Sequence, residues 1–380
     1  MKHIYFLYTS YCPNTAETNR ALSYLASLEK YGIDIDVIFF MPDKYRSKVS
    51  RDYKHIKIHY LWKWFPTTNK YLKYIPYVIN IIRFRLSLRS GDVIYMYNLN
   101  DIKRLFVKIK NIKTFHESTE CPEISLMPNV LHKCSIKEHL KTCKKMDGLF
   151  VISQALKQYY VMQGIESSKI HIINMTVDVS RFNNITKSKE VSVNPYIAYC
   201  GKISNNKDGV DHLIRAFSIV HEKYPKLKLV IIGDVPKNQN IENNMLLIEK
   251  LGLKDSIILT GKVEAEKIPQ MLVNAIALLL ARPDNKQAKY GFPTKLGEYL
   301  LSATPVVVTA VGDIPLFLED KNNALISEPE NDKMFADKIL WIMEHPKEAV
   351  QIGKKGKEIA LQNFNSDIEI MKLLSIINAK

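Results

Sequence analysis

The stretch that begins at Tyr290, YGFPTKLGEYLLSATPVVVTA, places a cation and a carboxylate at the start of a helix that leads into a strand. Pro293 suits a first helical turn, because its missing N–H would have no partner there. The next three N–H groups point outward at the positive end of the helix dipole and attract phosphate. Lys295 adds a mobile cation at this end, and Glu298, one turn deeper, can accept hydrogen bonds from both hydroxyls of a ribose. By themselves these residues are equally compatible with a nucleotide site and with a surface helix that carries a solvated Lys–Glu pair.

Alternating strand and helix patterns surround this stretch and continue through the whole chain, which is typical of parallel sheets covered by helices. Continuous apolar runs predict buried strands. With their adjoining turns, these runs are residues 3–8, 35–40, 59–65, 92–97, 113–116, 147–154, 169–178, 196–202, 227–233, 256–261, 275–281 and 305–309. The expected fold class is therefore α/β, with doubly wound, Rossmann-like sheets.

A chain of 380 residues is too long for one typical core and suits two domains. The polar stretch at residues 183–194 is rich in Lys, Ser and Asn and predicts a linker. We expect an N-terminal domain over residues 1–182 and a C-terminal domain over residues 195–362.

Several classes of site and of location are disfavoured by the composition. The five cysteines are odd in number and lack C-x-x-C spacing, so neither a disulfide framework nor a zinc site is predicted, and a reducing cytoplasm fits. Asp34 and Asp36 match a D-x-D metal motif, but acidic residues at a strand entrance are commonplace. The N-terminal apolar run is too short for a signal peptide, and no run reaches the ~18 apolar residues of a spanning helix. We expect a protein that is neither exported nor membrane-spanning.

The net charge of +15 is concentrated in one region of the chain. Residues 44–89 contain twelve basic side chains and one acidic side chain, an excess of 12 − 1 = +11. Such a patch favours anionic partners, which include lipid head groups, nucleic acid and phosphorylated substrates.

The stretch described first resembles the donor-site signature of the family 4 (group 1) glycosyltransferases of GT-B fold, written P-x-K-x-x-E-Y-[LM]-x-x-x-x-P-V-V. The matching positions are Pro293, Lys295, Glu298, Tyr299, Leu300, Pro305, Val306 and Val307. Many family members carry a first Glu eight residues before the second, where this chain has Tyr290. The resemblance implies two Rossmann-like domains facing across a cleft, with a terminal helix over residues 363–380 that crosses back to the N-terminal domain.

The resemblance also implies roles for individual residues. His116 would reach the donor sugar from a strand end, where the alternative is a histidine that merely closes the strand. Lys202, which follows Gly201, and Lys207 match the basic pair that flanks the donor diphosphate in the family. Two fixed cations there would stabilise the negative charge that grows on the diphosphate as the sugar leaves. The alternative is that both residues are solvated lysines of a loop. The remaining expected positions are Tyr290, Gly291, Phe292 and Thr294 for the donor, Lys262 and Val263 for the base, and Asn14, Thr15 and Glu117 for the acceptor side.

The function implied is the retaining transfer of a hexosyl or N-acetylhexosaminyl group from a nucleoside diphosphate sugar to an acceptor hydroxyl, without a metal or other cofactor. Bacterial surface polysaccharide or glycolipid synthesis is the expected context, with a glycan or lipid-linked acceptor. A GT-B nucleotide-sugar epimerase is one alternative. A catalytically silent protein that binds nucleotide sugar or nucleic acid is another, although nucleic acid is not the expected partner.

The basic segment at residues 44–89 also carries the composition of an interfacial helix, which predicts docking on the inner, anionic face of a membrane. The expected apolar face consists of Tyr71, Tyr74, Tyr77, Val78, Ile81, Ile82 and Phe84, preceded by Trp62, Trp64 and Phe65. The alternative is that this stripe packs on the first sheet and that the basic residues form its solvated face.

Overall fold

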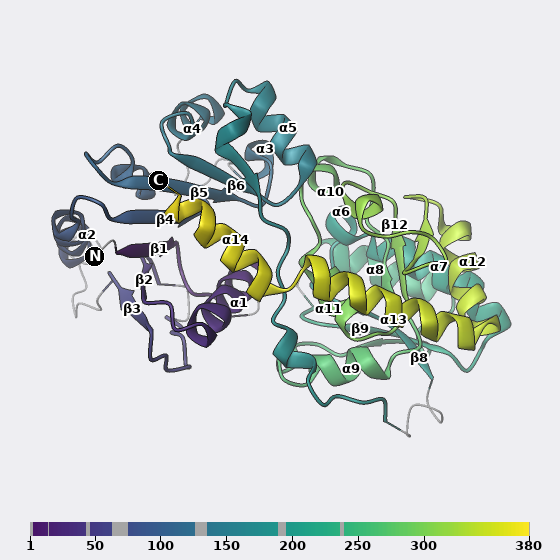
Figure 1. Ribbon diagram of the computed structural model, residues 1–380. Helices are drawn as coiled ribbons and strands as arrows, with labels where there is room; N and C mark the ends of the chain where they lie inside the picture. Colours follow the sequence, from purple (N-terminus) through teal and green to yellow (C-terminus); the bar gives the residue numbers. More distant parts are fainter. Residues whose placement is uncertain are drawn as a thin grey trace. The chain divides into compact units, whose positions relative to one another are not determined.

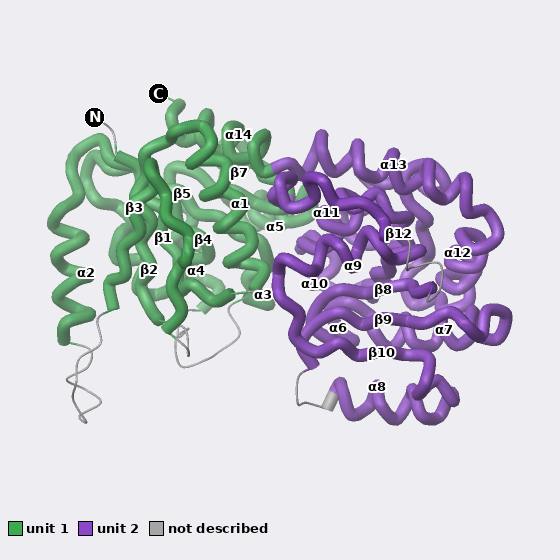
Figure 2. The backbone as a smooth tube through the Cα atoms, turned by 90° about the horizontal axis from the view of Figure 1, so that it is seen from below, with its two compact units in different colours: residues 1–174, 366–380 green, residues 175–365 purple. Residues whose placement is uncertain are grey.

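The computed structural model of the protein describes residues 3–13, 15–42, 46–62, 75–125, 135–188, 195–235 and 239–379. The chain forms two compact units (Figure 1, Figure 2). Unit 1 comprises Met1–Asn174 together with Ser366–Lys380, and unit 2 comprises Met175–Asn365.

Unit 1 is built, in its described residues, on a seven-stranded sheet in the order β3-β2-β1-β4-β5-β6-β7. Neighbouring strands are parallel. The strands are β1 (Ile4–Tyr8), β2 (Ile35–Phe39), β3 (Ile56–Tyr60), β4 (Val93–Tyr97), β5 (Lys113–Ser118), β6 (Gly148–Val151) and β7 (Ile170–Ile172). β2 and β4 are buried along their whole length, as continuous apolar strands require. Because the chain runs outward from β1 to β3 and then returns to the other side of β1, a topological switch point lies between β1 and β4.

The helices of unit 1 include one from the far end of the chain. They are α1 (Ala16–Lys30), α2 (Ile75–Ser87), α3 (Pro122–Ser125), α4 (Ile136–Cys143), α5 (Gln154–Met162) and α14 (Ser366–Asn378). The α1 and α14 helices lie side by side (Figure 1), where Ser27 Oγ donates to Ser366 Oγ at 2.9 Å. The buried face of α14 joins the core of unit 1 through Ile370, Leu373 and Ile377.

Unit 2 has, in its described residues, a six-stranded parallel sheet in the order β10-β9-β8-β11-β12-β13. The strands are β8 (Tyr196–Cys200), β9 (Lys228–Ile232), β10 (Ile257–Leu259), β11 (Leu278–Leu280), β12 (Val306–Thr309) and β13 (Leu325–Ser327). The helices are α6 (Asn205–Asp208), α7 (Val210–Lys223), α8 (Gln239–Lys250), α9 (Ile268–Asn274), α10 (Lys286–Tyr290), α11 (Thr294–Leu301), α12 (Asp332–Glu344) and α13 (Pro346–Asn363). Its switch point lies between β8 and β11.

These two parallel sheets confirm the α/β, doubly wound fold class expected from the sequence. The division of the chain differs from the linker expected at residues 183–194, because the units separate between Asn174 and Met175. Val177 N donates to Phe364 O at 2.9 Å, and Lys187 Nζ donates to Ala275 O at 3.2 Å. Residues 175–188 are therefore attached to unit 2, and the polar composition of residues 183–188 reflects their position on its surface; residues 189–194 lie outside the described residues.

The third strand of unit 1 also differs from expectation, because β3 covers Ile56–Tyr60 instead of residues 59–65. As the edge strand, β3 exposes alternate residues, so its apolar signal is weaker than that of the tryptophans which follow it. Trp64 and Phe65 fall outside the described residues. No helix in the described part of the chain has the length and apolar content to cross a membrane.

Candidate functional site

The carboxyl ends of the strands in unit 2 bring several chemically active residues to the switch point between β8 and β11. Gly201 directly follows β8, and Arg282 follows β11 by two residues. Open parallel sheets bind their ligands at this edge. Residues 201–209 connect β8 to α7 through the short helix α6, so this connection lies at the edge where a ligand is expected.

Lys295 is not the mobile cation that the sequence predicts, because its ammonium group is held inside this edge. Lys295 Nζ donates to Asp208 Oδ2 at 2.5 Å and to the Tyr199 hydroxyl at 3.1 Å, and lies 4.7 Å from the Tyr199 ring centroid. Burial lowers the pKa of Lys295, and Asp208 opposes that shift. Burial also disfavours the ionised form of Asp208, but Lys295 outweighs it and holds the pKa of Asp208 below its usual value. A buried ammonium needs a counter-ion, and Asp208 supplies it.

The Lys295 side chain lies so close to the backbone at Gly201 that it occupies the space a side chain at this position would need. A Cβ atom at Gly201 would lie 2.6 Å from Lys295 Nζ and 2.9 Å from the Tyr199 hydroxyl oxygen. Real side chains do not approach this closely, so any larger residue at position 201 would displace the lysine. Gly201 therefore allows the end of β8 to pack against the Lys295–Asp208 ion pair.

Lys202 and Lys207 extend the positive charge of this edge. Lys202 is exposed and Lys207 is half-buried. The positive charge of Lys207 adds to burial in lowering the pKa of Lys295. The buried side chain of Arg282 donates from Nε to Lys207 O at 3.2 Å. Among the described residues, four cationic side chains, Lys202, Lys207, Arg282 and Lys295, lie at this edge with the paired carboxylate of Asp208, which suits a ligand with more than one negative charge, such as a diphosphate.

Glu298 lies one helical turn into α11 and forms an ion pair with Arg181. Burial raises the pKa of Glu298, and Arg181 opposes that shift. Arg181 also donates from Nη2 to Ala265 O at 3.0 Å, so it joins α11 to the loop after β10. This loop holds Lys262, which is exposed, and Val263, which is half-buried. The structure therefore brings the carboxylate expected to bind ribose close to the loop expected to bind the base.

Tyr290, Gly291 and Thr294 lie in the connection from α10 to α11. Tyr290 ends α10 and is half-buried, with Lys289 Nζ 5.6 Å from its ring centroid. Gly291 is buried and donates its N–H to Gln287 O at 3.1 Å. Thr294 is the first residue of α11 and is half-buried.

Phe292 does not present its ring to a ligand. It is 7% exposed and packs against Phe317 and Phe364, with ring centroids 5.6 Å and 5.3 Å away. A buried aromatic ring that packs against other rings stabilises the folded protein through its large apolar surface and its contacts with those rings. Phe292 is therefore part of the core of unit 2, contrary to the role expected from the sequence.

His116 lies inside β5, two residues before the strand ends, and not at the strand end that the sequence predicts. Its side chain is 1% exposed, and His116 Nδ1 lies 3.3 Å from Met96 O. Burial lowers the pKa of His116 well below its usual value, and His139 adds to this shift. The imidazole is therefore neutral and enclosed in unit 1, which does not fit direct contact with a donor sugar.

Glu117 is also buried in unit 1, so it is not available to an acceptor. Arg20 Nε donates to Glu117 Oε1 at 2.5 Å, and the Tyr95 hydroxyl donates to Oε2. The Tyr24 hydroxyl lies 3.3 Å from the same oxygen. These partners satisfy the buried carboxylate, since a polar group in the core needs hydrogen bonds to offset its loss of water.

The loop after β1 contains the two other acceptor-side candidates. Thr15 caps α1, because its side chain accepts a hydrogen bond from Thr18 N, and Asn14 lies outside the described residues. The switch point of unit 1 holds a residue that the sequence did not suggest: Lys103 Nζ donates to Thr9 Oγ1 at 3.1 Å and to Asn98 O at 2.9 Å. Burial lowers the pKa of Lys103 to about 8, although Glu17 opposes the shift.

Sequence reasoning missed four residues of the unit 2 site: Tyr199, Asp208, Arg181 and Arg282. Asp208 directly follows Lys207, which was predicted from the sequence. The next residue, Gly209, indicates the end of the short helix α6 but says nothing about a role for Asp208. Arg181 lies in a 3₁₀ turn that the sequence assigned to the first domain. None of the four had a spacing that distinguished it from a surface residue.

Comparison with known proteins finds a similarity that covers most of unit 2. The family described as glycosyl transferases group 1 matches residues 180–359. The match covers 180 of the 380 residues of the chain. The whole chain also matches the crystal structure of the Anabaena protein HepE in complex with UDP and glucose, with a TM-score of 0.76, 17% identity and 100% coverage of both chains. The two-sheet architecture is thus the GT-B fold of glycosyltransferases.

Two curated proteins that this chain resembles are named for N-acetylglucosaminyl transfer. The phosphatidylinositol N-acetylglucosaminyltransferase of Arabidopsis thaliana has a component that is 26% identical over 50% of this chain and 40% of its own length. Poly(ribitol-phosphate) alpha-N-acetylglucosaminyltransferase from Staphylococcus aureus is 22% identical over 65% of this chain and 47% of its own length. The chain thus spans less than half the length of these relatives.

Proposed function

We propose that this protein is a retaining glycosyltransferase that moves a sugar from a nucleoside diphosphate sugar to an acceptor hydroxyl. One observation carries the proposal: at the switch point of unit 2, four cationic side chains lie at the edge that also holds the Glu298–Arg181 ion pair. The cations are Lys202, Lys207, Arg282 and Lys295. Fixed cations suit the diphosphate, and a carboxylate suits the hydroxyls of ribose.

The chemistry follows from the charge that develops in the reaction. Negative charge grows on the diphosphate as its bond to the anomeric carbon breaks, so cations at that position bind the transition state more tightly than the ground state. Lys295 is already oriented by Asp208 and Tyr199, which removes the cost of ordering it during the reaction. Lys202 and Lys207 supply the more accessible charges.

Retention fits a site in which positioning and charge stabilisation replace a nucleophile. The carboxylates of Asp208 and Glu298 are both engaged by cations of unit 2, through Lys295 and Arg181. We therefore assign no covalent intermediate to them. The acceptor hydroxyl would attack on the face that the diphosphate leaves, held there by the enzyme.

The donor that we propose is a UDP-linked hexose or N-acetylhexosamine, supported by the N-acetylglucosaminyl names of the two relatives and by the UDP in the HepE structure. The S. aureus relative is named for a ribitol phosphate polymer, and the A. thaliana relative for a phosphatidylinositol. We therefore propose a glycan or lipid-linked acceptor of a surface polysaccharide or glycolipid.

The deciding experiment is a thermal-shift screen with UDP-, GDP- and dTDP-sugars, followed by product analysis with and without acceptor. We expect one donor class to stabilise the protein and its sugar to appear on the acceptor with the anomeric configuration of the donor. An epimerised donor without acceptor would identify an epimerase. Donor binding without turnover of any tested pair would identify a binding protein.

Replacing Glu298 with alanine should weaken binding of the nucleoside diphosphate while the protein stays folded. One charge-assisted hydrogen-bonding partner contributes ~1.5–3 kcal/mol, which corresponds to an increase in Kd of roughly 10- to 150-fold. Calorimetric titration with UDP measures it. The control is Glu266→Ala, which removes an exposed carboxylate beyond the base loop. An unchanged Kd for Glu298→Ala would remove the ribose assignment.

Transfer should need no divalent metal at the diphosphate, because protein cations already neutralise it. We expect activity to persist during brief exposure to EDTA and to show no stimulation by Mg²⁺ or Mn²⁺. Initial rates with and without each ion provide the measurement. Activity that vanishes in EDTA and returns only with Mg²⁺ or Mn²⁺ would contradict the role given to the lysines.

Docking on an anionic membrane is a further part of the proposal, and the structure of α2 supports it. Five apolar side chains on α2 are between 42% and 78% exposed: Ile75, Val78, Ile79, Ile82 and Leu86. Their spacing of three and four residues places them along one side of the helix. Arg83, Arg85 and Arg89 are exposed beside them. Exposed apolar residues beside arginines fit the interface of an anionic bilayer, where each cation adds ~1 kcal/mol of attraction.

The exposed stripe is not the face that the sequence predicts. Ile81 and Phe84, expected on the docking face, are buried, whereas Val78 and Ile82 are exposed. Tyr71 and Tyr74 lie outside the described residues. One side of α2 is therefore buried in unit 1, and a second apolar side remains uncovered in the described residues, so docking on a membrane stays a proposal.

Sedimentation with vesicles tests this docking. The protein should bind vesicles that contain phosphatidylserine or phosphatidylglycerol, and binding should decrease with salt and with the double variant Val78→Ser/Ile82→Ser. Leu246→Ser, on an equally exposed leucine of α8, is the matched control. Equal binding to neutral and anionic vesicles, or full binding by the α2 variant, would exclude this surface.

A further inference from the structure

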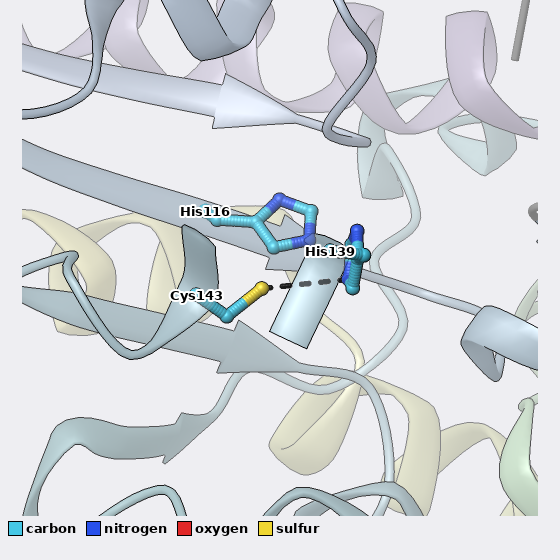
Figure 3. Close-up of side chains that lie close together, drawn as sticks. All are labelled: His116, His139 and Cys143. Carbon is cyan, nitrogen blue, oxygen red and sulfur yellow. Dashed lines mark hydrogen bonds between the residues drawn. The ribbon is translucent and has the colours of Figure 1, made fainter. Parts of the chain in front are cut away.

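Three side chains that the glycosyltransferase site does not use converge in the interior of unit 1 (Figure 3). They are His116 from β5 and His139 and Cys143 from α4, and all three are buried. One potential metal-binding atom of each residue lies within 4.8 Å of those of the other two. Residues 139 and 143 are four apart in a helix, so both side chains lie on the same face.

The two helical side chains are hydrogen-bonded to each other, and their separation is also close to that of two ligands of one zinc ion. His139 Nε2 lies 3.4 Å from Cys143 Sγ. Zinc bonds of ~2.0–2.1 Å to nitrogen and ~2.3 Å to sulfur, at a tetrahedral angle, place two such atoms roughly 3.5 Å apart. The candidate ligand atom of His116 lies within 4.8 Å of the other two. A small movement of its ring toward His139 and Cys143 would bring all three atoms to the separations that a shared zinc ion requires.

The tautomer of His116 is the one that metal binding requires. His116 Nδ1 faces the carbonyl oxygen of Met96 at 3.3 Å, so this nitrogen carries the proton. Metal-binding histidines commonly donate their second N–H to a backbone carbonyl in this way. His116 Nε2 then presents a lone pair toward His139, and this buried nitrogen has no hydrogen-bond partner among the described residues. A buried, unsatisfied polar atom in a native core calls for an explanation, and a bound ion is one.

We propose that His116 Nε2, His139 Nε2 and Cys143 Sγ bind a zinc ion that stabilises unit 1. Two imidazoles and a thiolate form a donor set that zinc prefers over Mg²⁺ and Ca²⁺. On binding, the thiol of Cys143 loses its proton to solvent, and the thiolate forms the bond to zinc. The Tyr160 hydroxyl, 3.2 Å from His139 Nε2, lies beside the fourth position, which it or a water molecule would occupy.

Such an ion would connect α4 to β5, whose His116 ring centroid lies 5.5 Å from that of His139. It would be separate from the diphosphate site proposed in unit 2. The absence of C-x-x-C spacing hid it in the sequence, because two of its ligands come from one helix and the third from a strand twenty-three residues earlier, 139 − 116 = 23. Its existence does not depend on the proposed transferase activity.

Metal analysis of the full-length protein, purified from zinc-supplemented medium and freed of unbound ions by gel filtration, tests the site. We expect about one zinc per chain in the wild type, and a fall in zinc affinity of at least ~100-fold in His139→Asn and Cys143→Ser, since even outer partners of a metal contribute 10- to 100-fold. The controls are His171→Asn, in β7, and Cys12→Ser, in the loop after β1; both should keep the zinc.

Zinc X-ray absorption on the wild type keeps the test decisive even where a variant fails to fold. We expect one sulfur and two imidazole nitrogens in the first coordination shell, and a thermal transition that decreases when the zinc is removed and recovers when it is returned. A wild type without stoichiometric zinc, an all-oxygen shell, or a folded Cys143→Ser variant with full zinc content would each overturn the proposal.

Discussion

Alanine in place of Lys202 or Lys207 should lower kcat by roughly 10²–10³-fold, the loss expected when one preorganised charge-stabilising group is removed. The Kd for UDP should rise by a much smaller factor. In the proposed site both cations would face a diphosphate whose charge increases as the donor bond breaks, so their interaction would be stronger in the transition state than in the ground state. Steady-state kinetics and calorimetry on the same preparations separate the two quantities.

Two further variants sharpen this test. Lys254→Ala removes an exposed lysine between α8 and β10 and should leave kcat unchanged. Lys202→Arg keeps the charge and should retain more activity than Lys202→Ala. Equal losses in kcat and in UDP affinity for the alanine variants would mean that these lysines only anchor the donor.

Replacing Arg20 with methionine should destabilise unit 1 by about 3–5 kcal/mol, because it leaves the carboxylate of Glu117 buried without its cation. The guanidinium is 2% exposed and holds three segments together. It donates to Glu117 Oε1 at 2.5 Å, to Asn174 O at 2.8 Å and to Ile173 O at 3.1 Å. Denaturant unfolding, monitored by circular dichroism, measures the change in the free energy of unfolding.

The matched control is an ion pair in the same unit that remains in contact with water. Lys30 Nζ and Asp367 Oδ2 are also 2.5 Å apart, but the lysine side chain is 62% exposed. Lys30→Met should cost at most about 1 kcal/mol. The double variant Arg20→Met/Glu117→Gln should recover part of the lost stability, since the charge is then removed. A loss below that of Lys30→Met would show that Glu117 is not a buried charge in solution.

The sequence alone determined the fold class and the position of the charged helix start. Buried parallel strands require continuous apolar runs, and such runs as residues 305–309 are visible in the chain without knowledge of their partners. The helix at residues 294–301 could be predicted for the same reason, since Pro293 and the apolar spacing act locally. These signals depend on neighbours within a few residues, which the sequence displays directly.

The tertiary structure decided which charges are neutralised and by what partners. The sequence predicts that Lys295 is a mobile cation, whereas in the structure Asp208, 87 residues earlier, binds its ammonium group. Glu298 forms its ion pair with Arg181, which lies 117 residues earlier. The sequence predicts that His116 and Glu117 contact substrates at the end of a strand. In the structure β5 continues past both residues, and their side chains lie in the core. Ion pairs, burial and metal geometry depend on distances in space, and residues remote in the chain carry no local pattern that reveals them.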